Sequence, residues 1–204
     1  MTLSEFDNEI RKDYNVVCGC DEAGRGPLAG DVFAAAVIFD KDTVIEGIND
    51  SKKLTVKKRE ELFDEIMEKA VDFSIQTATV EEIEDINILN AAMLAMKRAV
   101  EDMDTKPDVC LIDGNKTPEG LECPAIAVVK GDAKSQAVAA ASILAKVARD
   151  RYMEQMAELY PEYRFEKHKG YGTKLHYQMI DQYGPCGIHR MSFLKKYYAK
   201  KNGH

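Results

Sequence analysis

Residues 14–39 have the sequence YNVVCGCDEAGRGPLAGDVFAAAVIF, and this stretch decides the fold. Its two ends, residues 14–20 and 32–39, are short apolar runs rich in β-branched residues, a pattern that predicts two buried strands. The segment between them contains glycines and a proline, which favour a turn or loop. We expect the first strand to end at Asp21, so that a carboxylate and a glycine-rich loop directly follow a strand.

Extended and helical patterns alternate along the rest of the chain. Thr79 and Glu82 form a capping box that opens a helix. The apolar stripe of this helix is interpreted as core, and its members are Leu89, Met93, Met96, Val100 and Met103. Further strands are predicted at residues 71–78, 107–112 and 125–129, and further helices at residues 56–70, from about 135 to 160 and from about 174. These elements predict an α/β fold with a mixed five-stranded sheet flanked by helices and a helical C-terminal part.

The length and composition are those of one globular domain. The chain has 204 residues, of which 45% are hydrophobic and 31% charged, so it is not a disordered or fibrous protein. Its formal net charge of −7 argues against a protein that coats nucleic acid through bulk positive charge. Residues 146–204 nevertheless carry a net charge of +6. This basic part indicates either a polyanionic partner or a solvated helical surface.

The compartment is predicted from what the sequence contains and lacks. No apolar run approaches the length of a membrane span, and the polar N-terminus has no signal-peptide core. The five cysteines are odd in number and include no CxxC pair, which indicates reduced thiols rather than disulfides or a zinc site. We therefore expect a cytoplasmic protein without membrane contact. Cys18 and Cys20 are expected to point to the same face of the first strand.

Acidic residues follow three of the predicted strands. Asp21 and Glu22 follow the first, Asp113 ends the strand at 107–112, and Asp132 comes soon after the strand at 125–129. Neighbouring strands lie about 4.8 Å apart, so carboxylates at their ends can share a divalent cation. Ligand sets made only of oxygen favour Mg²⁺ or Mn²⁺, and a pair of such ions catalyses phosphoryl transfer. The alternative is that these acids only cap strands and turns.

Three other segments carry candidate binding residues. In Gly24-Arg25-Gly26 the glycines let the backbone approach a ligand and the arginine can pair with phosphate. Asn49, Ser51 and Lys52 precede a helix and can hold phosphate, or form an ordinary exposed helix entry. Tyr171 lies between glycines and basic residues, where it can stack on a sugar or base or be structural.

Seven motifs occur in an order that resembles the ribonuclease HII family, a family of type 2 ribonucleases H. They cover nearly the whole chain, from about residue 16 to 193: CDEAGRGPLAG, GINDSKKL, LIDGN, VVKGDAKS, AAASILAKVARDR, HKGYGT and HRMSF. The resemblance implies a ribonuclease H-like fold. It also implies an endonuclease that hydrolyses the RNA strand of RNA–DNA hybrids and incises duplex DNA at embedded ribonucleotides, a step of ribonucleotide excision repair. Its products carry 5′-phosphate and 3′-hydroxyl ends.

The resemblance also implies roles for particular residues. The residues that match the catalytic, metal-binding acids are Asp21, Glu22, Asp113 and Asp132. Gly24, Arg25 and Gly26 match the motif that senses the 2′-hydroxyl and the adjacent phosphate, and Tyr171 matches the tyrosine that packs on a sugar beside the RNA–DNA junction. The positions that match contacts near the DNA backbone are Asn49, Ser51, Lys52, Lys146 and Arg149. None of the histidines is assigned a catalytic role.

Two features qualify the match. Asp31 stands where the family often has proline, and we expect it to tune the loop rather than to bind metal. The first acid pair comes as early as Asp21, which leaves no room for the N-terminal binding domain of the ribonuclease HIII type. We therefore expect one catalytic domain over residues 1–204, acting as a monomer, with a sheet core at about 14–145 and a basic helical part at 146–204. A binding module that does not cleave is the alternative outside enzymes.

Overall fold

The computed structural model describes residues 1–202, so Gly203 and His204 of the predicted basic part lie outside the described residues. Its centre is a five-stranded sheet with the strand order β3-β2-β1-β4-β5. β1 is antiparallel to β2 and parallel to β4, β2 is antiparallel to β3, and β4 is parallel to β5. The prediction of a mixed five-stranded sheet is confirmed. The strands are β1 (Val17–Ala23), β2 (Val32–Ile38), β3 (Asp72–Ala78), β4 (Val109–Asp113) and β5 (Ala125–Val128).

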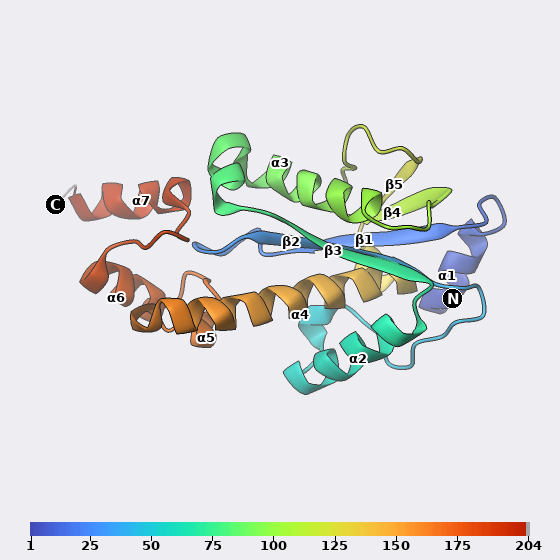
Figure 1. The fold of residues 1–204 in the computed structure, drawn as a ribbon, viewed down its shortest axis with the longest axis horizontal. Helices are drawn as coiled ribbons and strands as arrows, with labels where there is room; N and C mark the ends of the chain where they lie inside the picture. The colour runs from blue at the N-terminus through green and yellow to red at the C-terminus, as the bar shows by residue number, and fades with distance from the viewer. Residues whose placement is uncertain (203–204) are drawn as a thin grey trace.

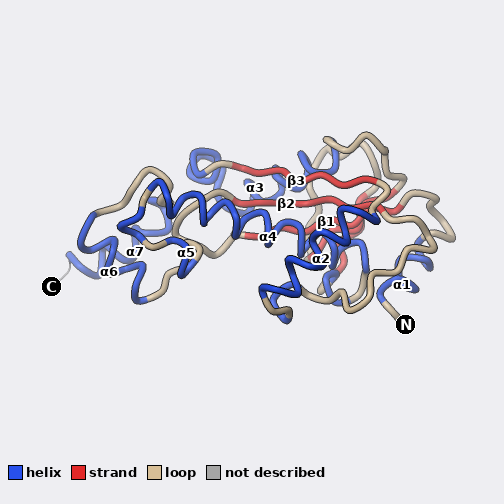
Figure 2. The backbone as a smooth tube through the Cα atoms, turned by 60° about the horizontal axis from the view of Figure 1, so that its bottom comes forward, coloured by secondary structure: helices blue, strands red, loops and turns tan. Residues whose placement is uncertain are grey.

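Helices cover both faces of this sheet. Figure 1 shows α3 on one side and α2 and α4 on the other, while α5, α6 and α7 gather at the end of the molecule away from the N-terminus (Figure 2). The helices are α1 (Leu3–Ile10), α2 (Val56–Lys69), α3 (Val80–Glu101), α4 (Gln136–Leu159), α5 (Phe165–His168), α6 (Lys174–Tyr183) and α7 (Met191–Asn202). Short 3₁₀ turns lie at Ser51–Lys53, Gly131–Ala133 and Pro161–Tyr163. No helix in residues 1–202 has the length and apolar character needed to cross a membrane.

The first turn of α4 packs closely against the middle of β1. A Cβ atom on Gly19 would lie 2.2 Å from the carbonyl carbon of Ala137, so only glycine permits this close approach. Cys18 and Cys20, on either side of Gly19, are both buried in the cluster that packs against α3. They share one face of the strand, as the alternation predicted, and both thiols are free.

The first strand is longer than predicted. β1 does not end at Asp21 but continues to Ala23, because Asp21, Glu22 and Ala23 still pair with Ala35, Ala34 and Phe33 of β2. The turn chemistry of the glycine-rich loop therefore begins only at Gly24. Asp21 and Glu22 belong to the rigid sheet rather than to the loop, which fixes their backbone.

The apolar stripe predicted in α3 is only partly core. Met96, Val100 and Met103 are buried as expected, but Leu89 and Met93 are only partly buried. Asn87 interrupts the helix with φ 67° and ψ 162°, which changes the direction of the chain just before the stripe begins at Leu89. The face that packs on the sheet is made instead mainly of small side chains, which permit close contact: Ala91, Ala92, Ala95 and Ala99.

Candidate active site

The register of the sheet brings two of the acids together. Cys20 pairs with Ile112 in the parallel ladder between β1 and β4, so the next residues, Asp21 and Asp113, leave the ladder at the same level. Asp113 pairs in turn with Val128 at the end of β5. Because parallel strands end at the same edge of a sheet, the carboxylates of β1 and β4 and the segment after β5 meet there.

Asp21 lies at the centre of this acidic edge and is only 4% exposed. Burial raises the pKa of its carboxyl group well above the usual range, and repulsion from Glu22 and Asp113 raises it further. Its Oδ1 accepts a hydrogen bond of 2.7 Å from the backbone N–H of Glu22. A buried carboxylate among like charges is costly unless a cation lies beside it.

A hydrogen bond connects the third acid to the fourth. Oδ1 of Asp113 accepts a bond of 2.6 Å from the backbone N–H of Gly131, the first residue of the 3₁₀ turn after β5. This bond holds the turn that carries Asp132 against the end of β4. Asp132 is 7% exposed, and burial followed by repulsion from Asp113 raises its pKa. Together with Glu22, which follows Asp21 in β1, the residues Asp21, Asp113 and Asp132 form one acidic edge.

The donor set of this edge fits divalent cations. Four carboxylates supply oxygen ligands only, which suits Mg²⁺ or Mn²⁺. Among residues 1–202, no three such side chains are gathered closely around one point. The negative potential of the acidic edge acts on Lys52. Burial lowers the pKa of its ammonium group, but the nearby carboxylates, first Asp21 and then Asp50, raise this pKa by more, so the net shift is upward.

A hollow of about 500 Å³ adjoins the acidic edge and contains most of the predicted binding residues. We call it the substrate groove. The predicted residues that line it are Glu22, Gly24, Arg25, Gly26, Ser51, Lys52, Lys146 and Tyr171. These residues lie up to 149 positions apart in the chain, from Glu22 to Tyr171. With Phe193, which also lines it, this one cavity unites residues of five of the seven motifs.

The glycine–arginine–glycine loop has one buried and two exposed residues. Gly24 is buried with φ 102°, and a Cβ there would lie 2.2 Å from Nε of Arg149. Gly26 is exposed, and its nearest neighbour for an added Cβ is the Tyr171 ring at 3.8 Å. Arg25 is exposed as well and forms an ion pair of 3.1 Å with Glu22. Packing thus requires glycine at position 24, whereas Gly26 leaves open space in the groove.

Tyr171 stands at the far wall of the groove with 42% of its surface exposed. The Lys146 ammonium lies 5.9 Å from the ring centroid, and its Nζ donates a hydrogen bond of 2.6 Å to Asp150. The carbonyl oxygen of Tyr171 lies 3.0 Å from Nδ1 of the buried His176. The backbone of Tyr171 is therefore anchored while its ring faces the groove.

Two predicted contact residues lie elsewhere than expected. Arg149 is 0% exposed, and its guanidinium donates to the carbonyl oxygens of Asp31, Lys169 and Ala29. A contact with a DNA backbone is incompatible with this burial, so we correct that expectation: Arg149 braces loops from inside. Asn49 is exposed but does not line the groove.

Sequence reasoning assigned no role to several residues that line or support the groove. Ile88, Ser142 and Phe193 line it, and the Ser142 hydroxyl lies 2.8 Å from that of the buried Ser51. Arg190 is fully buried beside the loop. Arg190 and Phe193 belong to the motif HRMSF, whose residue types alone indicate no particular chemistry. Asp31, the departure from the family pattern, accepts a bond of 3.0 Å from the N–H of Val80.

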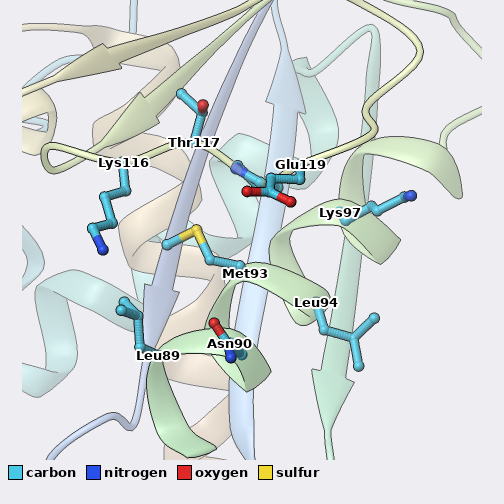
Figure 3. A pocket seen from close by; sticks show the side chains of 9 residues that line it. Leu89, Asn90, Met93, Leu94, Lys97, Lys116, Thr117 and Glu119 are labelled. Atoms are coloured by element: carbon cyan, nitrogen blue, oxygen red, sulfur yellow. The ribbon is translucent and has the colours of Figure 1, made fainter. Parts of the chain in front are cut away.

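A second hollow, of about 310 Å³, lies between α3 and the loop after β4 (Figure 3). Leu89 and Met93 of the predicted core stripe line it, together with Lys97 and Lys116. None of the four acids lines it. The partly exposed end of the stripe thus forms a surface hollow apart from the acidic edge.

Comparison with known proteins agrees with the resemblance. The family model described as Ribonuclease HII matches residues 18–196. The ribonuclease HII of Caldicellulosiruptor saccharolyticus is 56% identical over 93% of this chain and 92% of its own length. That of Idiomarina loihiensis is 59% identical over 87% and 95%. The crystal structure of ribonuclease H2 from Pyrococcus horikoshii OT3 aligns with a TM-score of 0.72 and 30% identity over 87% of this chain and 93% of that one. The chain therefore belongs to the ribonuclease HII family and is a ribonuclease H enzyme.

Proposed function

We propose that this ribonuclease H incises duplex DNA at single embedded ribonucleotides, in addition to cleaving the RNA strand of RNA–DNA hybrids. The observation that carries the proposal is the joint position of the acidic edge and the substrate groove. Asp21 and Asp113 leave the ladder between β1 and β4 at one level, and Glu22 lines the groove together with the exposed Gly26 and Tyr171. A site that joins cation ligands to a backbone loop and an aromatic ring suits one phosphate next to one ribose.

The four acids are proposed as the ligands of two Mg²⁺ or Mn²⁺ ions. Bound ions would supply an activated water and stabilise the leaving 3′-oxygen, giving 5′-phosphate and 3′-hydroxyl ends. Asp21 would be the central acid of this ligand set, because it is buried next to both Glu22 and Asp113. Asp132, held beside Asp113 by the Gly131 bond, completes the set.

The groove is proposed to select RNA by its 2′-hydroxyl. The backbone at Gly24, Arg25 and Gly26 can approach a ribose because Gly26 carries no side chain into the open space. The Arg25 guanidinium is 51% exposed, so it can leave its ion pair with Glu22 and bind the phosphate next to the ribose instead. The Tyr171 ring faces the same space and can pack on the neighbouring sugar.

The remaining grip is proposed to come from basic residues around the groove. Lys52 and Lys146 line it, and Ser51 and Asn49 lie in the segment next to it. The basic helical part adds further exposed lysines: Lys167, Lys174, Lys195, Lys196 and Lys200. We propose that residues 1–204 act as one monomeric catalytic domain on this basis.

A cleavage assay tests the proposal. The substrates are a labelled DNA duplex with one ribonucleotide, the same duplex without it, and an RNA–DNA hybrid, each with Mg²⁺, Mn²⁺ or EDTA. We expect cleavage of the first and third substrates with either ion and none with EDTA. Asp21→Asn should abolish it, whereas Asp64→Asn, at an exposed position of α2, should not. Cleavage of the hybrid alone would contradict incision at single ribonucleotides, and an active Asp21→Asn enzyme would contradict the assigned ligands.

A further inference from the structure

Arg190 makes an unusual set of contacts with the glycine–arginine–glycine loop. Its side chain is 0% exposed and donates five hydrogen bonds, all to backbone carbonyl oxygens of residues 24–30. Nη2 donates to Gly24 at 2.7 Å and to Gly30 at 2.6 Å, and Nη1 donates to Arg25 at 3.1 Å and Pro27 at 2.9 Å. Nε also donates to Gly30, at 2.9 Å. A single guanidinium group thus holds both ends and the middle of the loop.

Burying the charge of Arg190 is costly, so its hydrogen bonds to the loop carbonyls must compensate for the lost water. Burial lowers the pKa of Arg190, and the nearby Arg149 lowers it further, while Asp31 raises it. A buried cation is retained only when charged or strongly polar partners replace its water. Here the partners are the loop carbonyls, with Asp31 as the nearby counter-charge. Bonds from a charged donor to a carbonyl are stronger than neutral ones, so the loop conformation and the buried charge depend on each other.

Backbone contacts and a second arginine complete the support. Arg149 donates to the carbonyl of Ala29 from the side of α4. The N–H of Arg190 donates to the carbonyl of Leu28 at 2.8 Å, and the N–H of Gly30 donates to the carbonyl of Ile188 at 2.8 Å. The loop therefore lies between α4 and the segment that leads into α7, with little freedom to move.

The direction of these bonds determines which groups face the groove. In a trans peptide the C=O of one residue and the N–H of the next point in opposite directions. Since the carbonyls of Gly24 and Arg25 point inward to Arg190, the N–H groups of Arg25 and Gly26 point away from it. Within residues 1–202 neither of these amides donates to a protein acceptor. Two unpaired donors at an exposed loop beside the acidic edge are available to a ligand.

We propose that Arg190 is a positioning residue that fixes the amides of Arg25 and Gly26 as paired hydrogen-bond donors for the ribose 2′-hydroxyl and its adjacent phosphate. This inference rests on the proposed function, because it assigns a device to the same groove. Arg190 touches no substrate. It acts only through the orientation of the two peptide planes.

The test compares Arg190→Gln and Arg190→Lys with Arg11→Gln. Arg11 donates to the carbonyl of Phe39 at the opposite end of the sheet, so its replacement removes a similar brace far from the groove. Single-turnover cleavage is measured on the duplex with one ribonucleotide. Affinity for this duplex and for the all-DNA duplex is measured by fluorescence anisotropy with Ca²⁺ in place of the catalytic ion.

We expect Arg190→Gln to slow single-turnover cleavage by at least about tenfold, because small misplacement of a positioning group is costly. It should also lose the preference for the ribonucleotide-containing duplex while the affinity for all-DNA duplex changes by less than about twofold, since the exposed lysines remain. Arg190→Lys should recover part of the rate, and Arg11→Gln should match the wild type. Unchanged cleavage and preference in a folded Arg190→Gln protein would overturn the proposal, as would an equal loss of affinity for both duplexes.

If the Arg190 variants do not fold, a measurement on the wild-type protein still tests whether the loop is rigid. The ¹⁵N relaxation of Arg25 and Gly26 should give order parameters near the rigid-backbone value of about 0.85, although both residues are exposed. Values below about 0.6 would overturn the proposal. This readout needs no cleavage, so a wild type that fails on the single-ribonucleotide duplex contradicts the proposed function alone.

Discussion

Acid should destabilise this protein through buried histidines, two of which, His176 and His189, share one hydrogen-bond chain. The backbone N–H of Cys186 donates to Nδ1 of His189, whose Nε2 lies 3.0 Å from Nε2 of His176. Nδ1 of His176 must then donate to the carbonyl of Tyr171. His168, stacked on His176 with ring centroids 4.2 Å apart, accepts from Gly170 through its own Nδ1. Each ring is neutral in this arrangement, because every acceptor nitrogen is occupied by a donor.

The size of the effect follows from the pKa values. Burial lowers the pKa of His176 and of His189 to about 4, compared with about 6.5 in an unfolded chain. The folded state therefore binds fewer protons than the unfolded state between these values, so stability is complete above about pH 6.5 and is lost as the pH falls towards 4. Between about pH 8 and pH 5, each histidine should remove about 2 kcal/mol from the free energy of unfolding, or about 4 kcal/mol together. That is a large part of the stability of a typical domain.

Urea unfolding at about pH 8 and pH 5 measures this loss. We expect His176→Gln and His189→Gln to be less stable than the wild type at pH 8 but to lose about 2 kcal/mol less on acidification, because an amide does not titrate in this range. Asp7→Asn, which removes a buried carboxyl whose pKa is raised by burial, should leave the histidine-dependent loss in place. Histidine variants with the same acid-dependent loss as the wild type would refute the reasoning.

Four further predictions concern the groove and the core. Gly24→Ala should destabilise the protein by at least about 1–3 kcal/mol in thermal unfolding. The backbone φ of 102° is strained for alanine, and the new methyl group would also collide with Arg149. Gly26→Ala should change stability by less than about 0.5 kcal/mol but slow cleavage at least about tenfold, since its methyl group would occupy the open space of the groove. Tyr171→Phe should bind the ribonucleotide-containing duplex as the wild type does, whereas Tyr171→Ala should lose about 1–3 kcal/mol of binding free energy by anisotropy. Met96→Ala should cost about 2–5 kcal/mol in urea unfolding and Met93→Ala clearly less, because only Met96 is fully buried.

The central strands and the acids near their ends could be predicted from the sequence, because the signals for them lie within a few neighbouring residues. Apolar β-branched runs can be satisfied only by burial, and a polar residue directly after such a run lies at the edge of the sheet. This reasoning located Asp113 within one residue of the end of β4. The same reasoning ended β1 too early, at Asp21. The strand continues because Asp21 and Glu22 still pair with Ala35 and Ala34 of β2, and this pairing cannot be read from the sequence of β1 alone. It also did not predict α1, which opens with the capping box of Thr2 and Glu5.

The arginines show where local reasoning stops. Arg149 and Arg190 carry the same charge as the exposed lysines around them, so their sequence surroundings suggest a surface contact. Only the folded chain shows that Arg190 lies next to Gly24, 166 residues earlier, and that both arginines have backbone carbonyls as partners. Periodicity and residue type by themselves located the strands, most of the covering helices and the acids near the strand ends, because these patterns are read from a few neighbouring residues. Which cations face solvent and which brace the loop from inside was decided only by the tertiary structure, because the partners that make a buried charge tolerable come from distant parts of the chain.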